Sequence, residues 1–184
     1  MERMQKSPNS VKKLYCLWIK TGLEEKYIEE IQPALDSDFS ENKCSGKLIF
    51  LGKQMRLKNG KEYIDPLFPG YVFFEADRAE DFSVLQEGKG FMKILPQSVS
   101  PQPLCEKDAE FVYSLLKYGT LIPIVHVQFN VNDRIEILDG PLKGKEASIV
   151  AVNRRNNRVN FEVRLMNGMH ILGLTYEIVK KCEE

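Results

Sequence analysis

The sequence predicts an α+β domain, an antiparallel sheet flanked by helices, followed by a small five-stranded β-barrel of the SH3-like type. Before residue 117, short apolar runs alternate with two amphipathic stretches of helical period. After residue 130 there are only short β-branched and aromatic runs, separated by turn sequences such as Asp139-Gly140-Pro141 and Asn167-Gly168. Residues 118–129 have no clear period, and we expect them to be a linker.

The first domain is expected over residues 11–117, after a loose polar tail of residues 1–10. Residues 14–20, LYCLWIK, form an apolar run long enough for a buried strand. Residues 23–35 carry apolar side chains on one helical stripe and charged side chains on the opposite face. The chain therefore begins with a strand and then a helix.

The middle of the first domain contains turn and strand signals. Residues 47–63 hold an Asn-Gly pair after an apolar run, which predicts a hairpin. Residues 71–74 are expected to form a central strand, because Pro and Gly precede a run of bulky residues. A short helix over 79–86, a strand over 91–95 and a helix over 106–116 complete the domain.

In the C-terminal domain, residues 130–184, we expect five strands. These cover residues 134–138, 147–153, 159–165, 169–172 and 176–179. Strands this short and closely spaced are typical of a small closed barrel.

Composition excludes several classes of protein. The net charge is zero, so the whole chain offers no electrostatic argument for nucleic acid. The four cysteines are scattered without a CxxC pair or a nearby histidine, so we expect no metal site and no cofactor. No signal segment and no long apolar run is present, which predicts a cytoplasmic protein with reduced thiols and no membrane association. The sequence has no GxSxG, no P-loop, no HExxH and no His near a candidate nucleophile, so we expect no enzyme.

Two segments carry a family resemblance. Residues 67–75, LFPGYVFFE, resemble the signature of the NusG N-terminal domain, called NGN, and residues 14–31 are similar to its first strand and helix. Residues 133–153, DRIEILDGPLKGKEASIVAVN, resemble the KOW motif, in which a strand leads through Gly-Pro-x-Lys-Gly to a second strand. Both motifs occur in the order of the NusG family of transcription elongation and antitermination factors.

This resemblance implies a function. The NGN domain would bind the β′ clamp helices of RNA polymerase and bridge toward the β subunit, promoting processive transcription. The KOW domain would recruit a nascent RNA hairpin or a protein partner. Housekeeping members recruit the termination factor Rho or a ribosomal protein, whereas specialised paralogues such as LoaP and RfaH suppress termination on chosen operons. We expect a monomer.

By resemblance, an apolar depression formed by Trp18, Phe68, Tyr71 and Phe73 contacts the polymerase, and Ser83 is a candidate for the β-subunit contact. Aromatic anchors of this kind dominate many interfaces. The ordinary alternatives are core packing for the aromatic residues and a solvated helix face for Ser83. In an alternating strand Tyr71 and Phe73 share one face and Val72 and Phe74 share the other, and we expect only one of these faces to be the helix-covered core.

The KOW domain carries candidate RNA-binding residues in two loops that we expect to be adjacent: Lys143, Lys145, Arg154, Arg155 and Arg158. Such groups suit phosphate and base-edge contacts, although charged hairpin tips also serve solubility. Met166 stands where housekeeping members carry a Phe that binds Rho or the ribosomal protein, which favours a specialised paralogue. Two alternatives stay open: a housekeeping member, or a KOW-containing ribosomal protein, against which zero net charge argues.

Overall fold

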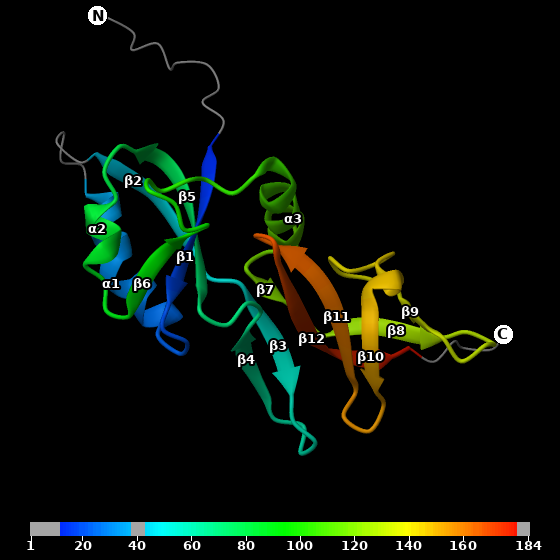
Figure 1. Ribbon diagram of the computed structural model, residues 1–184. Helices are drawn as coiled ribbons and strands as arrows, with labels where there is room; N and C mark the ends of the chain where they lie inside the picture. Colours follow the sequence, from blue (N-terminus) through cyan, green and yellow to red (C-terminus); the bar gives the residue numbers. More distant parts are fainter. Residues whose placement is uncertain (1–11, 38–42, 180–184) are drawn as a thin grey trace, which may run out of the picture.

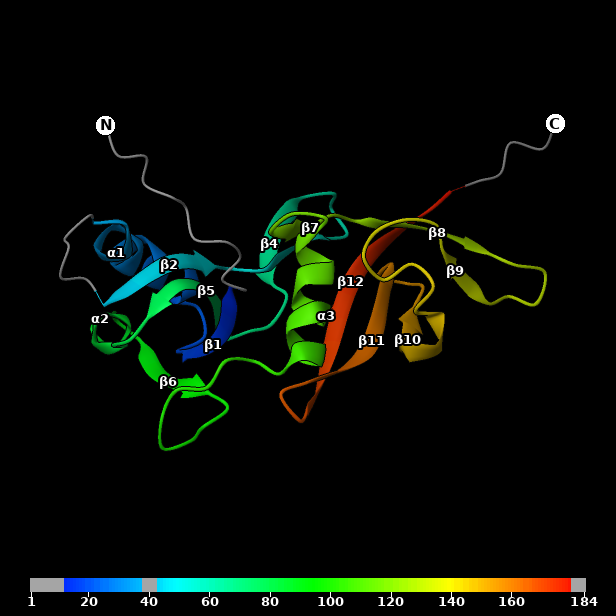
Figure 2. The ribbon, with the colours of Figure 1, turned by 90° about the horizontal axis from the view of Figure 1, so that it is seen from above.

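The computed structural model describes residues 12–37 and 43–179, so the expected tail of residues 1–10 lies outside the described residues. The predicted fold class, an N-terminal α+β domain followed by a C-terminal strand-rich domain, is confirmed, and the two domains lie side by side (Figure 1). Seen from above, α3 (Glu106–Leu116) lies between the two sheets (Figure 2). Within the described residues, no helix has the length and apolar character needed to span a membrane.

The main sheet of the N-terminal domain is antiparallel, with the strand order β2-β5-β1-β6. Its strands are β1 (Lys13–Ile19), β2 (Cys44–Ile49), β5 (Tyr71–Ala79) and β6 (Phe91–Leu95). The prediction that the strand after the Phe-Pro-Gly-Tyr sequence is central is confirmed, since β5 pairs with both β1 and β2.

Both faces of this sheet are buried, so the expectation of a single core face is wrong. Val72 and Phe74 pack with α1 (Glu24–Asp36) and α2 (Ser83–Gln86). Phe73 belongs instead to a second apolar cluster, which includes residues of α3 and of the C-terminal domain. The second face is covered because the C-terminal domain packs against it, which alternation within one strand cannot reveal.

A small second sheet has the order β4-β3-β7. Its hairpin consists of β3 (Gly52–Arg56) and β4 (Glu62–Pro66), joined through the predicted Asn-Gly turn, where Gly60 has φ +83°. The apolar run before this turn does not continue into the hairpin: β2 ends at Ile49 in the main sheet, and β3 begins at Gly52 in the second sheet. The helix expected over 79–86 begins only at Ser83, because the preceding residues through Ala79 continue β5.

The C-terminal domain is a five-stranded half-barrel with the order β10-β11-β12-β8-β9. The strands are β8 (Val125–Phe129), β9 (Ile135–Ile137), β10 (Ile149–Asn153), β11 (Arg158–Leu165) and β12 (Gly168–Ile178), and the 3-10 helix η1 (Glu146–Ser148) precedes β10.

The fifth strand comes from a different segment than expected. Residues 169–172 and 176–179, predicted as two strands, mostly belong to the single long strand β12. The missing strand is β8, inside the segment 118–129 expected to be a linker, and it pairs in parallel with β12. Part of the remaining connection is β7 (Leu121–Ile122), which pairs with β3 of the N-terminal hairpin. The segment between the domains is therefore fixed to both of them.

Glu24, at the start of α1, anchors the turn that leads into β5. Its side chain is buried, with 3% exposed. One carboxylate oxygen accepts a hydrogen bond from the Gly22 amide and the other from the Gly70 amide, both at 2.7 Å. Gly70 has φ +83°, and the Tyr71 amide donates to the Phe68 carbonyl at 3.0 Å, which closes the turn.

We expect Glu24→Ala to lower the free energy of unfolding by about 2–4 kcal/mol, because a buried amide loses a charged acceptor. The matched control is Glu25→Ala, the exposed neighbour in the same helical turn, which should change it by less than about 0.5 kcal/mol. Urea denaturation of both variants measures the difference. Equal effects would show that the carboxylate does not hold the turn.

His126 of β8 links three parts of the half-barrel. Its amide donates to Asp139 Oδ1 at 2.9 Å, and its Nδ1 lies 2.5 Å from Asp139 Oδ2. Its Nε2 lies 3.9 Å from Glu177 of β12. The hydrogen bond to Asp139 is the main cause that raises the pKa of His126 above its ordinary value.

The stabilisation from His126 should depend on pH in a defined direction. Because its folded pKa is raised, the contribution is complete below the unfolded value of about 6.5 and is lost as pH rises through the folded value. We expect the loss of stability in His126→Gln to be larger at about pH 5.5 than at about pH 8.5, on either side of the histidine range. Thermal denaturation of both proteins at the two pH values tests this, and a constant difference would contradict it.

Candidate functional site

The aromatic residues singled out in the sequence gather where the two domains meet. Trp18 and Tyr71 are register partners on the neighbouring strands β1 and β5. The ring of Phe68 lies edge-on to that of Phe73, with the centroids 6.0 Å apart. Phe68 is 2% exposed and Phe73 is fully buried, so Phe73 supports the Phe68 ring from below and does not reach the surface.

His170 of β12 covers part of this aromatic group. Its ring centroid lies 6.0 Å from that of Phe68 and 5.6 Å from that of Tyr71, and both contacts are edge-to-face. A small groove of about 250 Å³ remains along this contact, bordered by Pro69 and by Ile171. The half-barrel therefore covers Phe68 and also contacts the ring of Tyr71.

Trp18 stays accessible at the edge of the covered region. Its side chain is 39% exposed, and the Lys93 ammonium lies 5.1 Å from the ring centroid. Ser83 lies elsewhere. It is exposed at the start of α2, which packs on the opposite face of the sheet, and its amide donates to Asp81 at 2.9 Å. The structure thus brings Trp18, Phe68, Tyr71 and Phe73 together and leaves Ser83 apart.

The loop at Met166 is also held by the N-terminal domain. Met166 lies between β11 and β12 with φ +52°, and its amide donates to Asp108 Oδ2 of α3 at 3.0 Å. Its side chain packs against the apolar cluster that runs through both domains. The position that resembles a partner-binding site in the family therefore faces α3.

The five candidate RNA-binding residues do not form one cluster, which corrects the expectation of two adjacent loops. Lys143 and Lys145 lie before β10, and Arg154 and Arg155 lie just after it, at the other end of the strand. Arg154 forms an ion pair with Asp133 at 2.7 Å, and its guanidinium carbon lies 4.3 Å from the centroid of the Phe129 ring.

Arg158 serves the contact between the domains. Its guanidinium donates to Thr175 Oγ1 at 2.6 Å and to the Arg56 carbonyl at 3.0 Å. Thr175 is buried and also accepts the Arg56 amide at 3.4 Å. Among the described residues, Arg155 makes no ion pair or side-chain hydrogen bond, so it is the tip arginine that remains available to a ligand.

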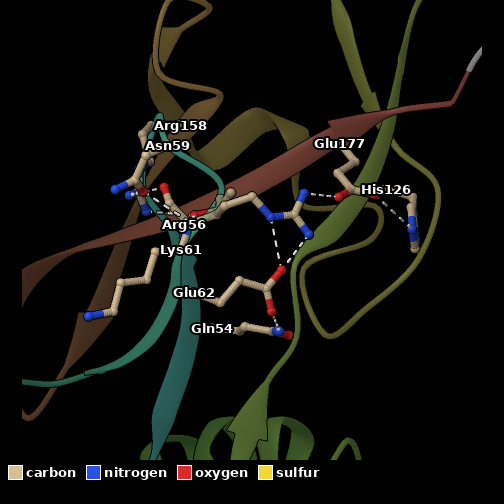
Figure 3. Close-up of polar contacts among 9 residues, drawn as sticks. Gln54, Arg56, Asn59, Lys61, Glu62, His126, Arg158 and Glu177 are labelled. Atoms are coloured by element: carbon tan, nitrogen blue, oxygen red, sulfur yellow. Dashed lines mark hydrogen bonds and ion pairs between the residues drawn. The ribbon is translucent and has the colours of Figure 1, made fainter.

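Sequence reasoning missed Arg56, the centre of a polar network between the domains (Figure 3). The Arg56 guanidinium donates to Glu62 at 2.9 Å within the hairpin and also pairs with Glu177 of β12. This guanidinium is the main cause that lowers the pKa of Glu62. The pairing of Arg56 with Glu62 could be guessed from hairpin geometry, but no local signal points to Glu177, which is 121 residues away.

The chain matches two family profiles. Residues 12–112, more than half of the chain, match the family described as "Transcription termination factor nusG". Residues 131–162 match the KOW motif. The first match contains the aromatic group and the Glu24 turn, and the second contains β10 and the first part of β11.

Relatives matched along most of their length agree with these profiles, and a solved structure shares the fold. The chain is 22% identical to the "Transcription termination/antitermination protein NusG" of Neisseria meningitidis serogroup B, over 92% of this chain and 98% of that protein. It is 22% identical to the protein of that name from Bacillus subtilis, over 84% of this chain and 89% of the other. The structure titled "Domain interaction in Thermotoga maritima NusG" has a TM-score of 0.56 at 21% identity, over 89% and 93% of the two chains. The chain belongs to the NusG family of transcription termination and antitermination factors.

Proposed function

We propose that the protein is a non-enzymatic elongation factor that binds RNA polymerase through the aromatic group of its N-terminal domain and promotes processive, antiterminated transcription. The observation that carries this is the position of Trp18 and Tyr71 on neighbouring strands, beside a turn held rigidly by Glu24. By the family resemblance, the surface that docks there is the β′ clamp helices, with a further contact toward the β subunit. This function places the protein in the cytoplasm.

The aromatic group suits such a partner physically. A helical coiled-coil tip offers a few apolar side chains, and aromatic anchors at protein interfaces often contribute about 2 kcal/mol or more each. Trp18 supplies an exposed ring with a cation beside it. Phe73 holds Phe68 in place from inside the core.

Use of Phe68 requires the half-barrel to move. His170 covers Phe68 in the docked arrangement, and Asp108 and Arg56 hold the half-barrel at two other points. If only a fraction of molecules is undocked, the apparent affinity for the polymerase falls by that fraction. The free protein then binds the polymerase more weakly than it would if its aromatic group were uncovered.

The half-barrel has a proposed partner of its own. We propose that this partner is a nascent RNA, bound through the basic residues Lys143, Lys145 and Arg155 together with Arg154 and Arg158. Rho or a ribosomal protein is the alternative, and it would need the Met166 loop to leave Asp108. A Met at this position supports a specialised role on chosen transcription units, as in paralogues of the LoaP and RfaH kind.

Trp18→Ala tests the polymerase contact without disturbing the half-barrel. We expect its dissociation constant for bacterial core RNA polymerase to rise about 30-fold, the equivalent of about 2 kcal/mol. The matched control is Tyr63→Ala, an aromatic residue of β4 with the same 39% exposure, which should bind like the unchanged protein. Biolayer interferometry measures both. Equal binding by the two variants would place the contact elsewhere.

His170→Ala tests whether docking limits binding. Removing the ring uncovers Phe68 and loosens the half-barrel, so the affinity for polymerase should increase by a fewfold. The control is Glu162→Gln, an exposed residue of β11, which should leave the affinity unchanged. An unchanged or lower affinity for His170→Ala would show that His170 does not compete with the polymerase.

A further inference from the structure

A polar groove of about 520 Å³ lies between the tip of the β3–β4 hairpin and the tip of the β10–β11 hairpin. Arg56 and Lys58 line it from the N-terminal domain, and Arg155 and Arg158 line it from the half-barrel. No carboxylate is among the described residues that line it. Neither domain forms this groove alone.

Two of the four cations hold the walls together. Arg158 is fixed by Thr175 and by the Arg56 carbonyl, and the charge of Arg56 is offset by Glu62 and Glu177 (Figure 3). These contacts set the spacing of the two tips. Arg56 and Arg158 therefore build the site: carboxylates offset the charge of Arg56, and neutral acceptors of the protein occupy donors of the Arg158 guanidinium.

Each wall supplies one cationic side chain whose donors no described residue occupies. Lys58 and Arg155 make no ion pair and no side-chain hydrogen bond within the described residues, and both line the groove. Lys61, at the same tip as Lys58, extends away from Arg56 and also has no side-chain partner among those residues (Figure 3). The groove thus presents unneutralised cations from both domains.

Amide side chains lie between these cations. Asn156 and Asn157 line the groove and are exposed, and neither side chain makes a hydrogen bond within the described part of the chain. The backbone around them is fixed, since the Asn157 carbonyl accepts the Tyr176 amide at 2.9 Å. Carboxamides both donate and accept, which matches base edges and sugar hydroxyls as well as phosphate.

We propose that this groove binds the sugar-phosphate backbone of a single nucleic-acid strand, and that it does so only while the two domains are docked. Clustered cations with interleaved amides provide the phosphate contacts that dominate nucleic-acid affinity. The volume lies within the range of about 300–1,000 Å³ usual for small-ligand sites, which suits a short stretch of one strand. A duplex would meet only the rim of a recess this size.

The proposal has a thermodynamic consequence. A ligand that binds the docked arrangement and not the undocked one shifts the population toward docking. Since docking covers Phe68, a strand in this groove would oppose polymerase binding. The groove deepens the RNA contact proposed above for Arg155 and Arg158. Only this last step rests on the proposed polymerase contact.

The experiment measures fluorescence anisotropy of a labelled single strand of about ten nucleotides, within the usual site sizes, on the full-length protein over a salt series. RNA and DNA of the same sequence are compared, and a preference identifies which of the two the groove receives. Lys58→Gln and Arg155→Gln should each weaken binding about fivefold and lower the salt slope by about one, since each removes a phosphate contact. The controls Lys89→Gln and Arg164→Gln remove exposed cations of each domain outside the groove and should have no effect.

Dependence on docking is tested with His170→Ala, which loosens the interface at Phe68 and Tyr71 and does not line the groove. This variant should weaken strand binding although it removes no basic residue of the groove. Unchanged binding by His170→Ala, or by Lys58→Gln, would overturn the composite site and leave the strand on the half-barrel alone. Equal binding of poly-glutamate at matched salt would overturn nucleic acid as the occupant. None of these readouts involves polymerase, so their failure is distinct from failure of the polymerase contact.

Discussion

The structure depends on the burial of the second face of the N-terminal sheet. Phe73 and Cys16 lie on that face, and α3 covers it together with the half-barrel in one continuous apolar cluster. Because this burial is shared, separating the domains exposes part of the N-terminal core as well as the interface, which gives docking a hydrophobic driving force. Polar contacts at the ends of the interface, from Asp108 and from Arg56, fix its orientation.

The packing of the half-barrel on the N-terminal sheet also connects structure and function. The half-barrel contacts Phe68 and Tyr71, two of the aromatic residues that would hold a polymerase subunit, and the Met166 loop is held by α3 in the same arrangement. Docking therefore covers two proposed binding surfaces: the half-barrel contacts the aromatic group, and α3 of the N-terminal domain contacts the Met166 loop. Trp18 stays outside this arrangement and offers a first point of contact that needs no rearrangement.

Local patterns in the sequence predicted most of the fold. The Asn59-Gly60 turn, the stripe of α1 and the central place of β5 follow from signals within a few residues. The errors arose where distant segments decide the structure: β8 lies in a stretch without clear period, and it is a strand because β12 and β9 pair with it. The aromatic group of the site was predictable through its resemblance to a family signature. The roles of Arg56, His170 and Arg158 were not, because their partners lie far away in the sequence.

Hydrogen exchange of the Met166 amide, with and without bound RNA polymerase, tests the covering of the aromatic group most directly. In the free protein this amide donates to Asp108 across the interface, so it should exchange slowly. If the polymerase takes the face that His170 covers, the half-barrel must leave, and exchange at Met166 should become fast while the segment around Trp18 becomes protected. Slow exchange at Met166 in the polymerase complex would contradict this expectation, because the half-barrel would then remain docked on the N-terminal domain while the polymerase is bound.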